Sequence, residues 1–597
     1  MEYIAIVKNP YSFANDTDFF LDPITNSIIK IPCHLSIFIK YCYEFKTIEE
    51  HAGFIYSKIS KTISIQEIIK HLNFFINKKI LISREEIINL IKANKSIQKT
   101  DKIKYLGYVT SGRSPELQLS IESYIKYSKS YNKNLAMIIC DDSKKNGEVL
   151  KNFYEIKSKN NVDIYYFGRD QKQKFIERLY KDLKDLVKKE ILQFMISDTF
   201  YQYACGANRN ALLLASAGSN IVSCDDDILF ESYVSKIQNN NEIDLTSQKR
   251  VMEILFYDNK KDLFDFVEPI DLDIINEHES FLGKNASEII SLKENSSISI
   301  KEIKYDFLLS LIRDDSSVKI TMPGIIGSSG MGSPSPILWI PDEQKERVFS
   351  SKKMYESSIC SNEVFRAPDK IKISDNNFLM SYNIGLNNQE FLPPFFPIGR
   401  GTESIFNSIL RKIFLNSCIC YMPFAVNHDP MKRKIYNHES VYNFSNNFSD
   451  ILVFLIDSFN ISDSIRTPEY RLNVLGNYFK EISNLRQIDF ISLITSLIIK
   501  QSSDFIKFLE SLLIKYDAKP KFWAEDIYKL IENIEKSING QDLYFPKELD
   551  NINICEDKEK SFKKILNLFG DLLISWESIY NASKKYNQQS IAFVKKL

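Results

Sequence analysis

Three consecutive carboxylates, Asp225, Asp226 and Asp227, follow an apolar stretch from Asn220 to Cys224. The stretch predicts a short buried strand, and α/β proteins place their chemistry at the ends of such strands. Because neighbouring carboxylates repel one another, a packed cluster usually holds a cation. Mg²⁺ and Mn²⁺ prefer oxygen ligands and commonly arrive bridged to phosphates. The run is therefore typical of a metal–diphosphate site, and a solvated acidic turn is the alternative.

Alternating strand and helix patterns must bring other side chains to these carboxylates. Apolar runs predict strands at Tyr105–Thr110, Leu135–Cys140 and Asp163–Phe167. Helical spacing of apolar residues predicts helices at Glu116–Tyr131 and Gly206–Ala217. Such alternation is typical of an α/β fold with a mainly parallel sheet.

The order of these segments resembles the nucleotide-binding half of a GT-A glycosyltransferase, and most closely the large group that includes family 2. The resemblance covers about residues 105–230, and three segments carry it: Val109–Leu117, Ile138–Ser143, and Gly206–Asn210 leading through Gly218 to the three carboxylates. The first segment departs from the usual Asn-Arg-Pro of that group, since it reads Gly112-Arg113-Ser114-Pro115. The resemblance implies a Rossmann-like core that binds a nucleotide-diphospho-sugar.

By this resemblance, a set of polar side chains would bind the donor: Thr110, Arg113, Asp141, Asp142, Arg209, Asp225 and Asp226. Asp141 or Asp142 would accept a hydrogen bond from the nucleobase, and Arg209 would meet the diphosphate. Asp225 would contact the ribose or the ion, Asp227 would bind the metal, and Asp226 would support them. Helix capping is the alternative role of Asp141 and Asp142, and a surface ion pair is that of Arg209.

Two residues farther along the chain complete the implied site. Glu403 follows a Pro-rich loop at the place of the group's acidic pair, of which this chain keeps one acid, and would be the catalytic base. A helix N-terminus would favour its ionised form. His428 ends an apolar run and would join Asp225 and Asp227 as a ligand of Mn²⁺ or Mg²⁺, imidazole being better suited to Mn²⁺. A helix cap and a structural histidine are the alternatives for these two residues.

The chain divides into three predicted units. Residues 1–100 order two strands, several helices and a final strand in a way that is similar to winged-helix peptide-recognition domains of peptide-modifying enzymes; a structural cap is the alternative. Residues 101–435 would form the transferase domain, with a helical insertion at about 240–315. Residues 436–597 would form a helical domain. The small residues from Gly327 to Ser333, with Trp339, would lie beside the donor sugar or the acceptor.

Composition narrows the partners. Lys plus Arg and Asp plus Glu number 77 each, which argues against a nucleic-acid-binding protein. Residues Met1–Pro10 lack a signal-peptide pattern, and no apolar stretch has the length of a transmembrane segment. Apart from Cys418 and Cys420 the cysteines are not closely paired, so a cytoplasmic location is expected.

The sequence therefore predicts a metal-dependent inverting glycosyltransferase that moves a sugar from a UDP- or GDP-sugar to a hydroxyl of a peptide or a glycan. A binding or scaffold protein with a degenerate transferase core is one alternative. A sugar nucleotidyltransferase is another. It is disfavoured because Gly112-Arg113-Ser114 is too short for the Gly-rich basic loop of that class.

Overall fold

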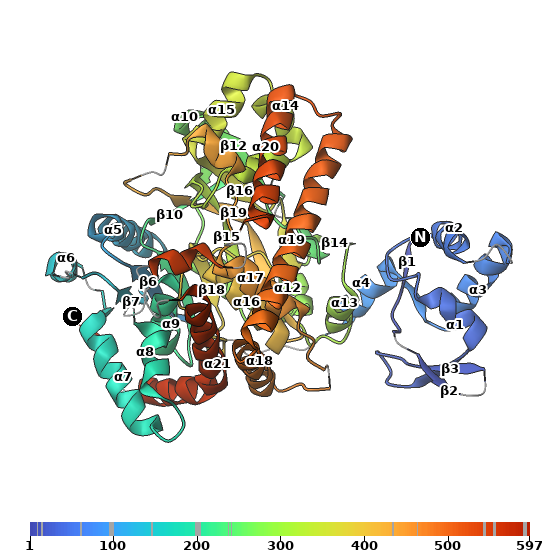
Figure 1. The fold of residues 1–597 in the computed structure, drawn as a ribbon, viewed down its shortest axis with the longest axis horizontal. Helices are drawn as coiled ribbons and strands as arrows, with labels where there is room; N and C mark the ends of the chain where they lie inside the picture. Colours follow the sequence, from blue (N-terminus) through green and yellow to red (C-terminus); the bar gives the residue numbers. More distant parts are fainter. Residues whose placement is uncertain are drawn as a thin grey trace.

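The computed structural model describes residues 1–597 except 9, 14–15, 60–62, 95–100, 145–146, 161, 198–203, 237, 240, 433–434, 463, 541–544, 553–556, 589–593 and 597. The fold is mixed α/β, which confirms the predicted class. A large sheet lies at the centre with helices around it, and a smaller N-terminal unit projects to one side (Figure 1).

The centre of the large sheet is parallel. β6 (Ile103–Thr110) lies between β7 (Ala136–Asp141) and β9 (Asn220–Asp225), and β8 (Ile164–Phe167) follows β7. The predicted strands are thus confirmed, with small differences at their ends. Because the chain leaves β6 toward β7 and β8 and returns on the other side as β9, a topological switch point lies between β6 and β9. Open α/β sheets bind ligands at such points.

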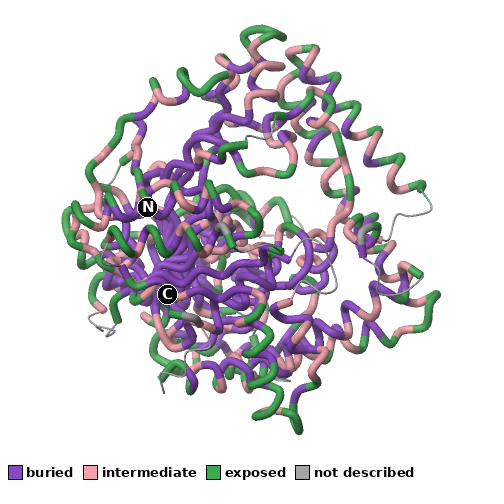
Figure 2. Tube along the Cα trace, turned by 90° about the vertical axis from the view of Figure 1, so that its left-hand side faces the viewer, coloured by how far each residue is buried: buried purple, intermediate pink, exposed green. Residues whose placement is uncertain are grey.

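The rest of the sheet is mixed, so the prediction of a mainly parallel sheet is wrong beyond β9. β18 (Asn383–Leu386) is antiparallel to both β9 and β15 (Ser317–Ser328), and β15 is parallel to β19 (Ser417–His428). The strands beyond β19 are β17 (Ile371–Ser374), β11 (Glu242–Thr246) and β14 (Ser297–Lys301). β15 and β19 are buried along their whole length, and buried residues concentrate along the sheet (Figure 2).

Helices cover the parallel strands. α5 (Ser114–Tyr131) follows β6, and α9 (Cys205–Ala215) packs on β6 and β7. A Cβ on Gly107 of β6 would lie 2.5 Å from a methyl group of Leu212, so glycine permits α9 to approach the strand closely. The other helices of this half are α6 (Gly147–Lys159), α7 (Arg169–Leu183) and α8 (Lys189–Ile196).

The segment predicted as a helical insertion at about 240–315 contains strands as well as helices, which corrects that prediction. In addition to β11 and β14 it holds β12 (Glu253–Tyr257), β13 (Val267–Ile270), α10 (Lys260–Asp265), α11 (Ile274–Phe281), α12 (Ala286–Leu292) and α13 (Tyr305–Ile312). The strands are short apolar runs among charged residues. A prediction from the overall polar composition of the segment therefore misses them. They extend the sheet instead of forming a separate body.

The following segment, between β15 and α16 (Thr402–Ile413), is built on short elements. These are η1 (Ser335–Trp339), α14 (Asp342–Val348), α15 (Lys352–Ser361) and β16 (Glu363–Ala367). β10 (Ile228–Ser235) directly follows the three carboxylates and pairs with β19.

The N-terminal unit has two small sheets. β2 (Tyr11–Phe13), β3 (Thr17–Leu21) and β4 (Ile28–Pro32) form one, and β1 (Tyr3–Ala5) pairs with β5 (Leu81–Ser83). Its helices are α1 (Cys33–Ile39), α2 (Ile48–Lys58), α3 (Ile65–Asn77) and α4 (Arg84–Ala93). Phe38, Leu72 and Phe75 belong to an apolar core of its own. α4 contacts α12 and α13 and so joins the unit to the main body.

The C-terminal part is mostly helical. It contains η2 (His438–Tyr442), α17 (Phe448–Ser458), α18 (Pro468–Ser483), α19 (Gln487–Lys515), α20 (Lys521–Ile538), η3 (Lys547–Asn551), α21 (Lys558–Gln588) and the short β20 (Lys595–Lys596). α21 packs on α18 and also contacts α7, α8 and α9 of the sheet-containing half. No single helix in the described ranges has both the length and the apolar character to cross a membrane. Only α18 and α19 taken together have that length and composition, and the two are bent by 117° relative to each other.

Candidate functional site

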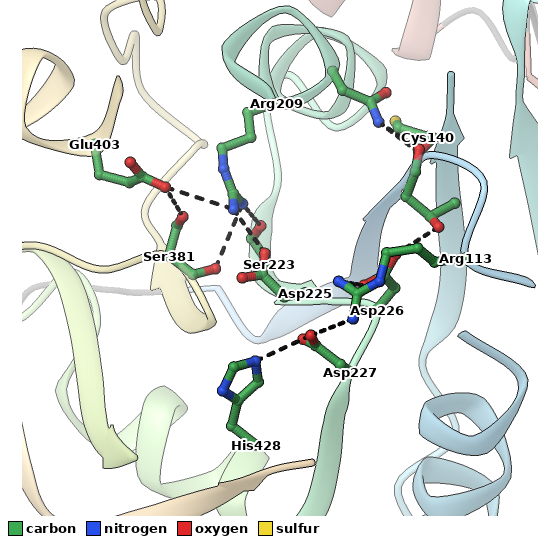
Figure 3. A network of polar contacts seen from close by, with 12 residues as sticks. Arg113, Cys140, Arg209, Ser223, Asp225, Asp226, Asp227, Ser381, Glu403 and His428 are labelled. Carbon is green, nitrogen blue, oxygen red and sulfur yellow. Dashed lines mark hydrogen bonds and ion pairs between the residues drawn. The ribbon is translucent and has the colours of Figure 1, made fainter. Parts of the chain in front are cut away.

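Three strand ends bring the predicted site residues to one edge of the sheet. Thr110 ends β6 opposite Asp141 at the end of β7, and Asp225 ends β9 opposite Val109. Asp226 and Asp227 form the turn into β10, whose first residue, Ile228, pairs with His428. Strand register therefore brings together residues that are about 200 positions apart in the sequence. Figure 3 shows the resulting cluster.

Asp227 is held by two cations. Its Oδ2 lies 3.0 Å from Nε2 of His428 and 2.6 Å from Nη2 of Arg113. The side chain is almost fully buried, and its second oxygen, Oδ1, has no hydrogen-bond partner among the described residues. Burial alone would raise the pKa of Asp227, but His428 and Arg113 hold it well below its usual range. Asp227 is thus a buried carboxylate with one oxygen left for a ligand.

His428 is oriented by the last residue of β15. Its Nδ1 lies 2.6 Å from the backbone oxygen of Ser328 and donates to it, so Nε2 faces Asp227. Burial would lower the pKa of His428, but the adjacent Asp227 carboxylate raises it to about 9. Gly327 and Gly330 have positive φ values of 103° and 63°, and a Cβ on Gly327 would lie 2.5 Å from the backbone oxygen of His428. Glycine at position 327 therefore lets the backbone of His428 lie close against this loop.

Asp226 faces β6. Its Oδ2 accepts a hydrogen bond of 2.7 Å from the hydroxyl of Thr110, and its Oδ1 lies 2.8 Å from Nη1 of Arg113. Burial raises the pKa of Asp226 to about 7 even though Arg113 opposes that shift. Arg113 thus bridges Asp226 and Asp227 from the start of α5, and 37% of its side chain remains exposed.

Arg209 links Asp225 to Glu403. Its Nη2 lies 2.7 Å from Oδ1 of Asp225 and 3.8 Å from Oε1 of Glu403. The guanidinium is buried, and its Nε has no hydrogen-bond partner among the described residues. Ser381 donates a hydrogen bond of 2.6 Å to Oε1 of Glu403. The surface ion pair considered for Arg209 is thus replaced by a buried one inside the site.

The loop that carries Glu403 is fixed to the helix that carries Arg209. A Cβ on Gly206 would lie 1.8 Å from the backbone oxygen of Phe396, so only glycine allows this contact. Gly401, with φ of 72°, is the N-cap of α16 and places Glu403 in the first turn of that helix.

Asp141 and Asp142 are held by internal partners. Asp141 accepts hydrogen bonds from the backbone and hydroxyl of Ser143 and from the hydroxyl of Tyr166, and it is 1% exposed. Asp142 pairs with the buried Lys172. A nucleobase would have to displace one of these contacts in order to use either carboxylate.

Sequence reasoning missed two residues of this network, Lys172 and Asn208. The amide of Asn208 donates to the backbone oxygens of Thr110 and Cys140, at 3.1 and 2.9 Å, and thereby joins the ends of β6 and β7. Lys172 donates to Asn208 at 2.7 Å. The Asn-Arg-Asn sequence at the start of α9 signals Asn208, whereas nothing in the charged run around Lys172 marks it as buried.

Trp339 packs on a helix of the C-terminal part. Its ring packs edge to face on Phe505 and Phe508 of α19, with centroids 5.7 and 6.0 Å away. The prediction that it lies beside the donor sugar or acceptor stays a prediction. The sequence around Trp339 does not indicate that α19 packs on its ring.

The fit of the site to a divalent cation is partial. Within the described ranges, no group of three or more His, Cys, Asp or Glu side chains is arranged to hold a metal ion. Asp227 and His428 are nevertheless in contact, and the free Oδ1 of Asp227 is a ligand atom that lacks a partner. Asp225 is turned toward Arg209. The residues would hold a cation through Asp227 and, once its Nε2 has lost a proton, through His428. Asp225 would be added once Arg209 engages another anion.

No protein-family model matches the sequence, and no curated protein matches it either.

Proposed function

We propose that this protein is a metal-dependent inverting glycosyltransferase with a GT-A-like core, which moves a sugar from a nucleotide-sugar donor to an acceptor hydroxyl. The observation that carries the proposal is the meeting of two sets of residues at the carboxyl edge of the parallel strands. Asp227, His428 and Arg113 form one set, and Asp225, Arg209 and Glu403 form the other. Ligands of open α/β sheets bind at this edge.

The first set would serve the diphosphate of a UDP- or GDP-sugar. Asp227 and His428, with Asp225, would hold Mn²⁺ or Mg²⁺, which would act as a Lewis acid on the diphosphate oxygens. Arg113 and Arg209 are both paired with carboxylates here. A cation at these carboxylates would release the two guanidinium groups, which match phosphate oxygens well. They would then stabilise the charge that grows on the departing diphosphate.

Glu403 would be the catalytic base. It would take the proton from the acceptor hydroxyl while the oxygen forms a bond to the anomeric carbon. The bond from that carbon to the diphosphate breaks on the opposite side, so the configuration at the anomeric carbon is inverted. Ser381 orients the carboxylate, and Arg209 lies beside it.

The N-terminal unit would recognise a peptide that presents the acceptor hydroxyl. β4 is an outer strand of its three-stranded sheet, and Ile28 at the start of β4 is 68% exposed. An outer strand can pair with an extended peptide through backbone hydrogen bonds, while exposed apolar side chains give specificity. This supports the role of residues 1–100 as a recognition unit.

Nucleotide binding tests the proposal. Isothermal titration calorimetry with UDP and GDP should show binding that requires Mn²⁺ or Mg²⁺ and is lost on addition of EDTA. Asp227→Ala should weaken that binding at least tenfold because it removes the central ligand. Asp265→Ala, on the exposed side of α10, is the control and should bind as the wild type does. Equal binding by the Asp227 and Asp265 variants would contradict the proposal.

A binding or scaffold protein is the second candidate, and one observation favours it. Arg113 and His428 already neutralise Asp226 and Asp227 without any metal. A scaffold that kept these ion pairs for stability would lose stability in the Asp227 variant, yet it would bind no nucleotide. The same calorimetric experiment therefore separates the two candidates.

A further inference from the structure

A cavity of about 450 Å³ lies between α10 and the end of β12 on one side and α14 and α15 on the other. Small-molecule sites commonly measure roughly 300–1,000 Å³, so this cavity is large enough for a small ligand or for one side chain of a partner. The three helices all contact β12, and α10, α15 and β12 lie together at the top of Figure 1. The residues that line the cavity take no part in the proposed transfer.

Two carboxylates of the lining have no cation beside them. Asp258 directly follows β12, and its Oδ1 is buried without a hydrogen-bond partner among the described residues. Asp262, in the first turn of α10, accepts a hydrogen bond of 2.9 Å from the side-chain amide of Asn259. Neither carboxylate forms an ion pair within the part of the chain that the structure describes. The third, Asp265, pairs with Lys261.

Arg347 is a cation of the lining, but its guanidinium is engaged by other groups. Its Nη2 donates to the backbone oxygen of Phe256 and, at 2.8 Å, to Oε1 of Gln344. The guanidinium lies over the ring of Tyr257, 4.3 Å from the ring centroid. Three carboxylates and one guanidinium therefore belong to the described lining, and the negative charge exceeds the positive.

Two deeply buried polar side chains also face the cavity without a partner. Tyr257 is 4% exposed, and its hydroxyl makes no hydrogen bond to the described residues. Gln344 is 8% exposed, and its Nε2 makes none to them either. Because buried polar groups are normally hydrogen-bonded, such groups at a cavity wall indicate a missing ligand. Nε2 of Gln344 is a donor, as is the buried Nε of Arg347, which also lacks a partner there.

The rest of the wall is apolar. The ring centroids of Tyr257 and Phe266 lie 5.6 Å apart, and Met354 adds a flexible apolar side chain. The methylene stem of a lysine or arginine packs on such a surface while its charged end remains with polar partners. Aromatic faces also attract cations. A bare metal ion would leave this surface unused, and an anion would be repelled by Asp258 and Asp262.

We propose that this cavity binds a lysine or arginine side chain of a peptide. The ammonium or guanidinium group pairs with Asp258 and Asp262, and the stem lies against Tyr257 and Phe266. A carbonyl oxygen of the peptide backbone accepts a hydrogen bond from the free donors of the wall. The inference goes beyond the proposed function, because this binding requires neither a nucleotide nor a metal.

α10 connects the cavity to the proposed metal site. Lys260, the first residue of α10, lies 3.0 Å from Oδ2 of Asp429. The backbone N–H of Asp429 donates to the backbone oxygen of Asp227 at 3.1 Å. In a transferase that acts on a peptide, a basic side chain held in the cavity would therefore anchor the acceptor beside the site.

The class of ligand can be tested with the wild type alone, in the absence of metal and nucleotide. The probes are blocked Gly-Lys-Gly and Gly-Arg-Gly tripeptides, the same tripeptide with norleucine, and the free diamine cadaverine, titrated by saturation-transfer NMR. We expect a basic tripeptide to bind and the norleucine tripeptide to bind at least tenfold more weakly, because it lacks the charge. Cadaverine should bind several-fold more weakly, because it lacks the peptide carbonyl.

Two variants locate that binding. Asp258→Asn and Asp262→Asn keep the shape of the side chain and remove its charge, so each should weaken binding of the basic tripeptide about tenfold. Asp504→Asn in α19, at an exposed carboxylate 4.0 Å from Lys507, is the matched control and should bind as the wild type does. Metal-dependent UDP or GDP binding should be the same in all four proteins.

Three results would overturn the inference. The first is that the norleucine tripeptide binds as tightly as the lysine tripeptide, and the second is that both cavity variants bind like Asp504→Asn. The third is that cadaverine matches the lysine tripeptide, which would assign the cavity to a free amine. A protein that binds nucleotide with metal but no basic tripeptide refutes the cavity ligand alone. A protein that binds the tripeptide but no nucleotide refutes the transferase alone.

Discussion

At the residue scale, the site is built from carboxylates that are each paired with a cation of the chain. Asp225 pairs with Arg209, and Asp227 pairs with Arg113 and His428. Buried ion pairs of this kind are costly to break by removing one partner. Their purpose in a transferase would be to hold the arginines ready until a metal and a diphosphate exchange partners with them.

Arg113 gives the first prediction at this scale. Arg113→Gln should bind Mn²⁺ several-fold more tightly than the wild type when no nucleotide is present, because Asp227 loses a competing cation. The variant should also bind UDP or GDP several-fold more weakly, because the diphosphate loses a guanidinium partner. Calorimetry measures both affinities. Arg178→Gln on α7, whose side chain is similarly exposed and also paired with an Asp, is the control. Unchanged Mn²⁺ affinity in the Arg113 variant would refute the exchange of partners.

Glu403 gives the second. Glu403→Gln keeps the hydrogen bond from Ser381 but cannot accept a proton, so transfer should fall by about 10²–10⁴-fold. Metal-dependent nucleotide binding should persist. Product formation is followed by mass spectrometry with peptide and glycan acceptors, and Glu510→Gln on the exposed face of α19 serves as the reference. Transfer at the wild-type rate would remove Glu403 as the base.

At the scale of elements, the position of the site depends on β15 and β18 as well as on β9, which carries Asp225. His278 of α11 is fully buried; its Nδ1 lies 2.6 Å from the hydroxyl of Thr321 on β15, and its Nε2 lies 2.8 Å from Oδ1 of Asn383 on β18. Asn383 in turn donates to the sulfur of Cys224, the residue before Asp225. These contacts connect the end of β9 to β18, to α11 and to β15.

His278 should make stability depend on pH. Burial lowers the pKa of His278 from 6.5 to about 4, so the folded protein binds fewer protons than the unfolded chain between these values. The stabilising contribution is complete above about pH 6.5 and is lost as pH falls toward 4, an effect of about 3 kcal/mol. Urea unfolding of the wild type should show this extra loss, and His278→Gln should lack it. His34→Gln, at an exposed position, should retain the wild-type slope. Parallel profiles of the wild type and His278→Gln would contradict the assignment.

Some of the helices and strands can be predicted from the sequence, and others cannot. Apolar runs and helical spacing predict β6, β7, β8, α5 and α9, because each is a local pattern. The short strands β11 and β12 escape prediction since charged neighbours surround them. The candidate residues are recognised by type and order, but their partners are not. Lys172 meets Asp142, and Trp339 meets α19, only through long-range packing that no local pattern records.

At the scale of the whole molecule, the chain joins a small N-terminal unit to a large body that contains the main sheet. The N-terminal unit has its own apolar core and meets the body mainly through α4 (Figure 1). The C-terminal helices belong to the body, because the hydroxyl of Tyr580 and the indole of Trp576 on α21 donate to backbone oxygens of Asn388 and Leu392. Hydrogen bonds from α21 thus hold the start of the Pro-rich loop that leads to Glu403.

We propose that the whole chain transfers a sugar from a nucleotide donor with the help of a divalent cation. The most direct measurement is the release of nucleoside diphosphate from UDP- and GDP-sugars by the purified full-length protein, with Mn²⁺ or with EDTA. We expect release from at least one donor that requires the metal and that Asp227→Ala abolishes. An absence of release from every donor with either metal, in a preparation that is folded and monodisperse, would contradict the account.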